Sequence, residues 1–106
     1  MEKNDEEIKK FASFASAVLD RPGMFNVNNV EDLDLILLGY FLGLGATIGP
    51  CESLNEMLSA FRAFINNEFD TKGDYDWARI IRFNSAGDQH SIELFKLKFN
   101  HFMSTY

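Results

Sequence analysis

The stretch Arg21-Pro22-Gly23-Met24-Phe25 separates two apolar segments and sets where the first helix can end. Proline cannot continue a helix and disfavours helical geometry in the residue before it, while Gly23 permits a tight turn. We therefore expect the chain to leave its first helix just before Pro22. Met24 and Phe25 are large apolar residues inside a connector, so we expect both to fold back, to be largely buried and to cover one end of the core.

The segment before this stretch has the pattern of an amphipathic helix. Asn4 followed by Glu7 has the spacing of a capping box, and the neighbouring acidic residues suit the positive end of a helix. Apolar residues then recur at helical spacing, at Ile8, Phe11, Ala12, Ala15, Val18 and Leu19. The pattern predicts that one face of this helix lies on a core.

The segment after the stretch predicts a second and more apolar helix. Asn28 and Glu31 repeat the capping-box spacing. Residues 33–44 are apolar nearly all round, which is typical of a helix buried on most sides. Gly39 and Gly43 lie four residues apart on one face, and we expect them to allow close packing against another helix.

Three further helices follow, with polar connectors between them. Ser53 with Glu56 predicts the start of the third helix, a shorter helix is expected at residues 75–83, and the last one follows the connector at residues 84–88. The expected inward residues are Leu54, Met57, Leu58, Phe61, Phe64, Ile65 and Phe69, then Trp77, Ile80 and Ile81, then Ile92, Phe95, Phe99, Phe102, Met103 and Tyr106. We predict an all-α fold, a compact bundle of about five helices forming a single domain over residues 1–106.

Composition restricts the partners of this chain. Its 106 residues carry a net charge of −6, which argues against nucleic acid and anionic membranes and suits a basic partner. The apolar run at residues 35–49 is shorter than the roughly 20 residues needed to cross a bilayer. The acidic first residues do not resemble a signal peptide, and the single Cys51 cannot form an internal disulfide. We therefore expect a cytoplasmic protein.

The residues that could perform chemistry do not form a known motif. Cys51 near a helix start would need a base, and only His90 and His101 could serve. The loop from Asp70 to Asp76 resembles a calcium loop weakly, because Lys72 stands at a ligand-like position and no glutamate closes it. The glycines at residues 39–45 do not follow a strand, as a dinucleotide site requires. We expect no enzymatic activity, no metal and no cofactor.

Acidic residues remain as candidates for binding. Those at Glu31, Asp32 and Asp34 are explained by a solvated helix start. Those of the third connector are less easily explained by capping, and they lie beside aromatic residues of the kind enriched at protein interfaces. We predict a partner-binding surface formed by Glu68, Asp70, Asp74, Tyr75 and Asp76.

The order of these features resembles a known family. It consists of the stretch at residues 21–25, an apolar helix with Gly39-Tyr40, a later Trp77-Ala78-Arg79-Ile80-Ile81 and a closing aromatic helix near residues 95–102. This layout resembles small bacterial immunity proteins of polymorphic toxin systems, including those of contact-dependent growth inhibition. The related motif usually ends in tyrosine, so Phe25 departs from it and lacks the hydroxyl group.

The resemblance implies an inhibitor that binds and neutralises the toxic domain of a secreted protein by blocking its active site or substrate channel. Such toxins are frequently nucleases with basic surfaces, which an acidic inhibitor would match. Two alternatives stay open. One is a small helical adaptor or regulator, which an exposed apolar groove beside Gly39 and Gly43 would favour. The other is a ligand-binding or enzymatic bundle that uses Cys51 or His101.

Overall fold

In the computed structural model, which describes residues 2–106 and their side chains from Glu6 onward, the first helix ends where the proline stretch begins. Helix α1 spans Glu2–Asp20, and Pro22–Phe25 form the short 3-10 helix η1. The expected end before Pro22 is confirmed. The expected cap residue Asn4 falls inside α1, and its side chain lies outside the described residues.

The expected burial of both apolar residues in the connector is wrong. Met24 is 72% exposed. Phe25 is only partly buried, and its ring meets that of Phe14 edge to face at a centroid distance of 6.1 Å. Adjacent residues of a 3-10 helix point about a third of a turn apart, so one of the two turns away when the other contacts the core. The left-handed backbone conformation of this connector is at Asn26 (φ 59°).

Helix α2 (Val30–Ile48) begins one residue later than the expected cap would give. Asn29, rather than Asn28, is the cap: its Oδ1 accepts from the Asp32 amide at 2.9 Å, and the Asp32 carboxylate accepts from the Asn28 amide at 2.9 Å. A second cap comes from far along the chain. The Val30 amide donates to Oγ of the buried Ser91 at 3.0 Å, and that hydroxyl donates to the Asp88 carbonyl.

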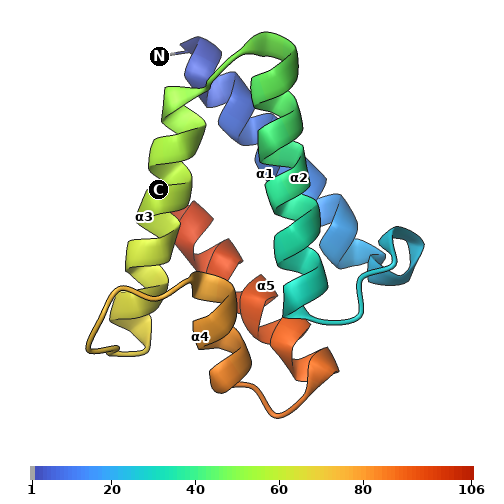
Figure 1. Ribbon diagram of the computed structural model, residues 1–106, viewed down its shortest axis with the longest axis vertical. Coiled ribbons are helices and arrows are strands. Elements are labelled where there is room, and N and C mark those ends of the chain that lie inside the picture. Colours follow the sequence, from blue (N-terminus) through green and yellow to red (C-terminus); the bar gives the residue numbers. More distant parts are fainter. Residues whose placement is uncertain (1) are drawn as a thin grey trace.

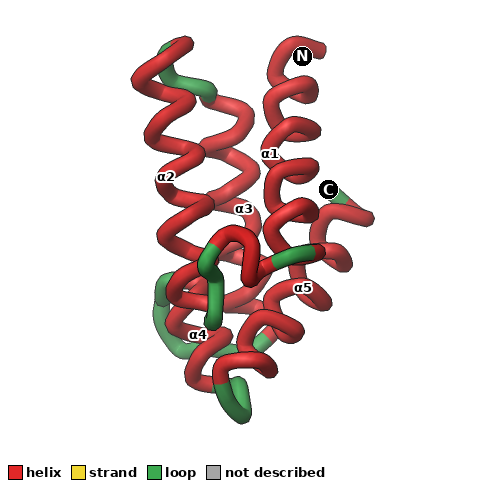
Figure 2. The backbone as a smooth tube through the Cα atoms, turned by 90° about the vertical axis from the view of Figure 1, so that its right-hand side faces the viewer, coloured by secondary structure: helices red, strands yellow, loops and turns green. Residues whose placement is uncertain are grey.

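The remaining helices are α3 (Glu52–Glu68), α4 (Trp77–Phe83) and α5 (Asp88–Thr105). Residues 2–106 contain no strand, as Figure 2 shows. The expected start of α3 at Ser53 is wrong, because the helix follows Cys51 and no side chain caps it. Helix α4 starts at Trp77, two residues later than expected, because the backbone of Tyr75 is bonded to a side chain of α3.

Helices α2 and α3 diverge from their connection like the two sides of a V (Figure 1). The open end of the V is occupied by α4 and α5, each of which packs against both α2 and α3. Helix α1 packs mainly against α3 and also contacts α2. The five helices therefore form an all-α globule in which consecutive helices α2 and α3 are held apart by the others.

An aromatic cluster centred on Phe61 fills the space between the helices. Its ring lies 5.3–5.7 Å from those of four residues, namely Trp77, Phe95, Phe99 and Phe102. The expected inward faces of α1, α3, α4 and α5 are confirmed by their buried members Phe11, Ala15, Val18, Leu19, Leu54, Met57, Phe61, Ile65, Ile80, Ile81, Ile92, Phe95, Phe99 and Phe102. The other residues expected to face inward are partly buried, namely Ile8, Ala12, Leu58, Phe64, Phe69, Trp77 and Met103, except Tyr106, which is exposed.

The expected burial of α2 on most sides is wrong. Only Val30, Leu33 and Leu37 of this helix are buried, while Leu35 is 66% and Leu42 is 60% exposed. The space beside Gly39 and Gly43 is open, so these glycines do not permit a close helix contact within the described residues. The reason is the position of α2 at the margin of the bundle, where α1, α4 and α5 cover one side and no helix of residues 2–106 covers the other.

Candidate functional site

The connection between α3 and α4 is fixed by the side chain of Asn66. Its Oδ1 accepts from the Tyr75 amide at 3.0 Å and from the Thr71 hydroxyl, and its Nδ2 donates to the Tyr75 carbonyl at 2.9 Å. The Asn66 side chain thus makes both of the hydrogen bonds that a neighbouring β-strand would make to the backbone of Tyr75. The expected partner surface is therefore built on an ordered loop.

Two of the four carboxylates of the expected partner surface form ion pairs within the protein. Asp74 Oδ1 lies 2.9 Å from Arg62 Nε, and Glu68 Oε1 lies 2.7 Å from Lys98 Nζ. The hydrogen bond from Lys98 lowers the pKa of Glu68 below its usual range. Asp70 is exposed in a left-handed conformation (φ 50°), and Asp76 is exposed directly before α4. Among the described contacts, neither of these two has a cationic partner.

The same connection borders a surface groove of about 520 Å³. The groove is lined by Phe69, Asp70, Thr71, Lys72, Tyr75, Arg79, Ile80, Phe83 and Asn84. It brings together Asp70 and Tyr75, whereas Glu68, Asp74 and Asp76 lie outside its lining. Phe83, which is 88% exposed, was missed by sequence reasoning, although it falls outside the apolar face of α4 that Ile80 and Ile81 define. The groove also carries Lys72 and Arg79, so it is not purely acidic.

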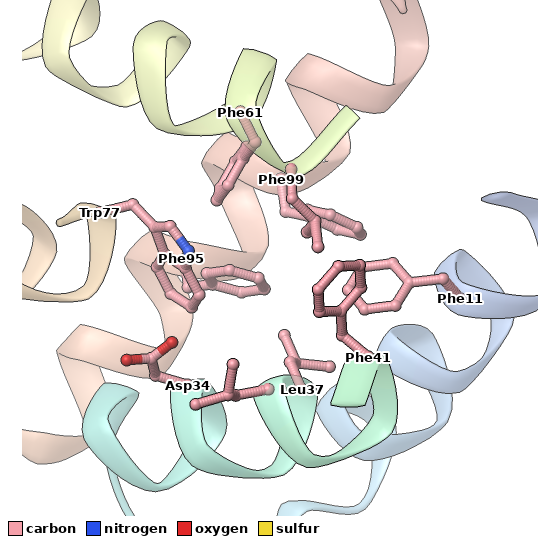
Figure 3. A pocket seen from close by; sticks show the side chains of 10 residues that line it. Phe11, Asp34, Leu37, Phe41, Phe61, Trp77, Phe95 and Phe99 are labelled. Atoms are coloured by element: carbon pink, nitrogen blue, oxygen red, sulfur yellow. The ribbon is translucent and has the colours of Figure 1, made fainter. Parts of the chain in front are cut away.

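A second hollow, the α2–α3 cleft, opens inside the V and has a volume of about 90 Å³. It is lined by Phe11, Asp34, Leu37, Leu38, Phe41, Leu58, Phe61, Trp77, Phe95 and Phe99. Figure 3 shows side chains from all five helices pointing into this one space, with aromatic rings on several sides and a single carboxylate at the edge.

That carboxylate, Asp34, is the one charged group in the lining of the cleft. Its side chain is half-buried, and no described donor or cation contacts it. Burial, and then the charges of Asp76 and Glu31, raise the pKa of Asp34 from 3.8 to about 6. The interpretation of this residue as part of a solvated helix start is therefore wrong. A lone carboxylate within the apolar run at residues 33–44 was the sequence signal for it.

The neighbouring Glu31 has the opposite environment. Arg82 donates from Nε and Nη2 to the two carboxylate oxygens of Glu31 at 2.8 and 2.7 Å, and Nη2 also lies 2.7 Å from Asp88. These hydrogen bonds lower the pKa of Glu31 and raise that of Arg82. One guanidinium thus joins the starts of α2 and α5 to α4, and Asp34 is left without such a partner.

The residues weighed for catalysis have different neighbours. The sulfur of Cys51 lies 3.6 Å from the Ser53 hydroxyl, His90 Nδ1 accepts from the Ala86 amide at 2.7 Å, and His101 stacks on Phe64. Across the described part of the chain, no three His, Cys, Asp or Glu side chains are placed to share a metal ion. No helix among the described residues is long and apolar enough to cross a membrane.

Comparison of this chain with models of protein families, with curated proteins and with solved structures finds no match.

Proposed function

We propose that this protein is an immunity protein, which binds the toxic domain of a cognate secreted protein and blocks its active site or substrate channel. One observation carries the proposal: α2 exposes Leu35 and Leu42 on a side that no other helix of residues 2–106 covers, and the exposed Leu38 lies beside them in the lining of the α2–α3 cleft. Large apolar side chains gathered on one face are typical of a surface that binds another protein.

The charge of the protein favours a basic partner. The net charge is −6, and Asp34, Asp70 and Asp76 have no internal cationic partner among the described contacts. A basic nuclease domain would be attracted by these carboxylates, with an association rate that falls as salt is added. The resemblance to immunity proteins rests on the residue pattern given above and points to the same kind of partner.

The partner-binding surface remains a prediction for Glu68, Asp70, Asp74, Tyr75 and Asp76. Because Glu68 and Asp74 have ion-pair partners within the chain, changing them would also release Lys98 and Arg62 and so alter more than one charge. The sharper variant is D70N together with D76N, which removes two unpaired charges and leaves both ion pairs intact. Asn tolerates the left-handed conformation at position 70.

The proposal is tested by growth rescue. If the gene directly upstream encodes a secreted protein with a toxic C-terminal domain, that domain is expressed in cells with or without this protein, and survival and complex formation are measured. We expect wild-type protein to rescue growth, and L35S together with L42S to abolish rescue. The matched control is L97S on α5, which removes a leucine of similar exposure outside the α2 face. Absence of rescue by wild-type protein would overturn the proposal.

A helical adaptor is the second candidate, because the open apolar surface beside Gly39 and Gly43 is the feature that favours it. The two functions differ in their outcome for the partner. An immunity protein abolishes the activity of the bound toxin at one-to-one stoichiometry, whereas an adaptor leaves the activity of its partner intact. A titration of toxin activity against added protein separates them.

A further inference from the structure

The α2–α3 cleft has a built apolar interior. Phe61 and Phe95 form part of its wall from α3 and α5, and Trp77 closes it from α4 with its ring 5.0 Å from that of Phe95. A cavity of about 90 Å³ has room for a group of several non-hydrogen atoms. An apolar group of that size would contact aromatic surface on several sides.

The chemistry at the edge of the cleft is anionic. Asp34 is half-buried there, and its carboxylate faces Glu31 from its own helix and Asp76 from the start of α4, both acidic. Of these three groups, Glu31 has Arg82 as its partner. The linings contributed by α1, α3 and α5 are apolar. No cation of the described chain reaches Asp34, so its charge is free to pair with one from outside.

The apolar surface continues from this cleft along α2. A second hollow near the connection to α3 is lined by Phe41, Leu42, Leu44, Gly45, Pro50, Cys51, Glu52 and Asn55. It shares Phe41 with the α2–α3 cleft. The twelve residues from Asp34 to Gly45 make eleven steps along the helix, which rise about 16 Å or three turns. This length fits a short helical or extended segment of a partner.

We propose that the α2–α3 cleft receives a lysine or arginine side chain of the protein partner, whose alkyl portion packs among the aromatic rings while its cationic end pairs with Asp34. The apolar residues beside that side chain cover Leu38 and Leu42. This inference rests on the proposed function for its partner, a basic protein, but the occupancy of the cleft can be measured without that partner. Aromatic walls suit this occupant, since a cation near ring faces gains electrostatic attraction.

The test uses side-chain analogues and the single tryptophan of the chain. n-Butylammonium and n-butylguanidinium are titrated separately into 15N-labelled protein at pH 7.5, with the indole N–H of Trp77 and the backbone amides near Asp34 followed by NMR. n-Butanol and pentanoate, of similar apolar length, are the uncharged and anionic controls. We expect the two cations to shift these resonances saturably and pentanoate to leave them unchanged.

Variants separate the charge from the apolar wall. D34N should weaken binding of the cations about tenfold, because one charge-assisted contact is lost. E93Q, at an exposed carboxylate of α5 outside the lining of the cleft, is the matched control and should bind as the wild type does. L38A should also weaken binding, whereas L97A, a leucine exposed on α5, should not. The affinity should fall from pH 7.5 to pH 5 as Asp34 takes up a proton, with Glu31 and Asp76 as the other groups that face it.

Equal binding of n-butanol and n-butylammonium would overturn the proposal, and so would unchanged affinity in D34N or shifts confined to the groove around Phe83. The experiments distinguish an error in the proposed occupant of the cleft from an error in the proposed function. Toxin rescue without any binding of the cations rejects the cleft alone. Saturable, Asp34-dependent binding of the cations without toxin rescue supports the cleft and rejects toxin neutralisation.

Discussion

The α3–α4 connection and the α2–α3 cleft are both acidic, but they treat their charges differently. In the connection, Arg62 and Lys98 neutralise two carboxylates, and Asn66 fixes the backbone. In the cleft, Asp34 is half-buried against apolar side chains and has no cationic partner among the described contacts. The number of acidic residues in a region therefore does not show where a basic partner binds. A carboxylate is available to such a partner only where no cation of the same chain already pairs with it.

The largest expected effect tests whether the wall of the cleft is also the core of the protein. F61A should lower the free energy of unfolding by about 3–5 kcal/mol, because a fully buried ring is replaced by a cavity. F83A, at the exposed aromatic residue beside the connection, should cost less than about 0.5 kcal/mol. Denaturant unfolding of both variants measures the difference. Similar losses in the two would remove the distinction between the regions.

Asn66 tests whether the connection is ordered by one side chain. N66A should lower the free energy of unfolding by about 2 kcal/mol, since the amide and carbonyl of Tyr75 lose their partner and the Thr71 hydroxyl loses one of its acceptors. Limited proteolysis should then cut within residues 70–76 before any other site. N67A is the matched control from the next, exposed position and should leave the cleavage pattern unchanged.

The D34N variant tests whether the unpaired charge of Asp34 lowers the stability of the protein when no partner is bound. Its pKa is raised to about 6 in the folded state from 3.8, so the stability that its protonated form contributes is present below pH 4 and is lost as the pH rises through 6. D34N should therefore be more stable than wild type by about 1–1.5 kcal/mol at pH 7.5, a value reduced for solvent screening of a half-exposed group.

The two proteins should approach equal stability below about pH 3, where Asp34 is largely protonated in both the folded and unfolded states. Thermal unfolding across this pH range measures the difference, with E93Q as the control. A D34N variant that is less stable than wild type at pH 7.5 would show that Asp34 has a favourable internal partner. That result would contradict the comparison directly.

The smallest expected effect concerns an ion pair of the connection. R62Q should lower the free energy of unfolding by less than about 0.5 kcal/mol, because both partners are well exposed and the pair is screened. The loss should shrink further in 0.5 M NaCl. A loss well above 1 kcal/mol that persists in salt would mean that the ion pair, and not Asn66, holds the connection.

The residue pattern predicted burial correctly for the helices that are apolar on one face only. The faces centred on Phe11, Phe61 and Phe99 follow from helical spacing alone, and the stop before Pro22 follows from proline geometry. The predicted burial of α2 was wrong for a different reason. An apolar sequence indicates only that burial would be favourable, whereas actual burial depends on which helices are available to cover it. The shift from Asn28 to Asn29 has a local reason, since adjacent asparagines offer the same capping group.

The candidate site was predictable only in part. Asp70 and Tyr75 do share a groove, as two neighbours on one short loop can. The cleft could not be read from the sequence, because its lining comes from all five helices and residues as distant as Phe11 and Phe99. The environment of Asp34 depends on the same long-range packing. The residues next to Asp34 in the sequence do not show that the cations of the chain pair with other carboxylates.

The contact between Val30 and Ser91 has a consequence for synthesis of the protein. The cap that Ser91 supplies to α2 lies 61 residues further along the chain, so it is absent when α2 leaves the ribosome. At 5–20 residues per second this delay lasts about 3–12 s. During that interval the most apolar helix has its local cap at Asn29 and its contact with α1, but it lacks the second cap and the two helices α4 and α5 that cover most of its inner side. We therefore expect the nascent chain to bind chaperones until α5 has emerged, because this apolar surface is still uncovered.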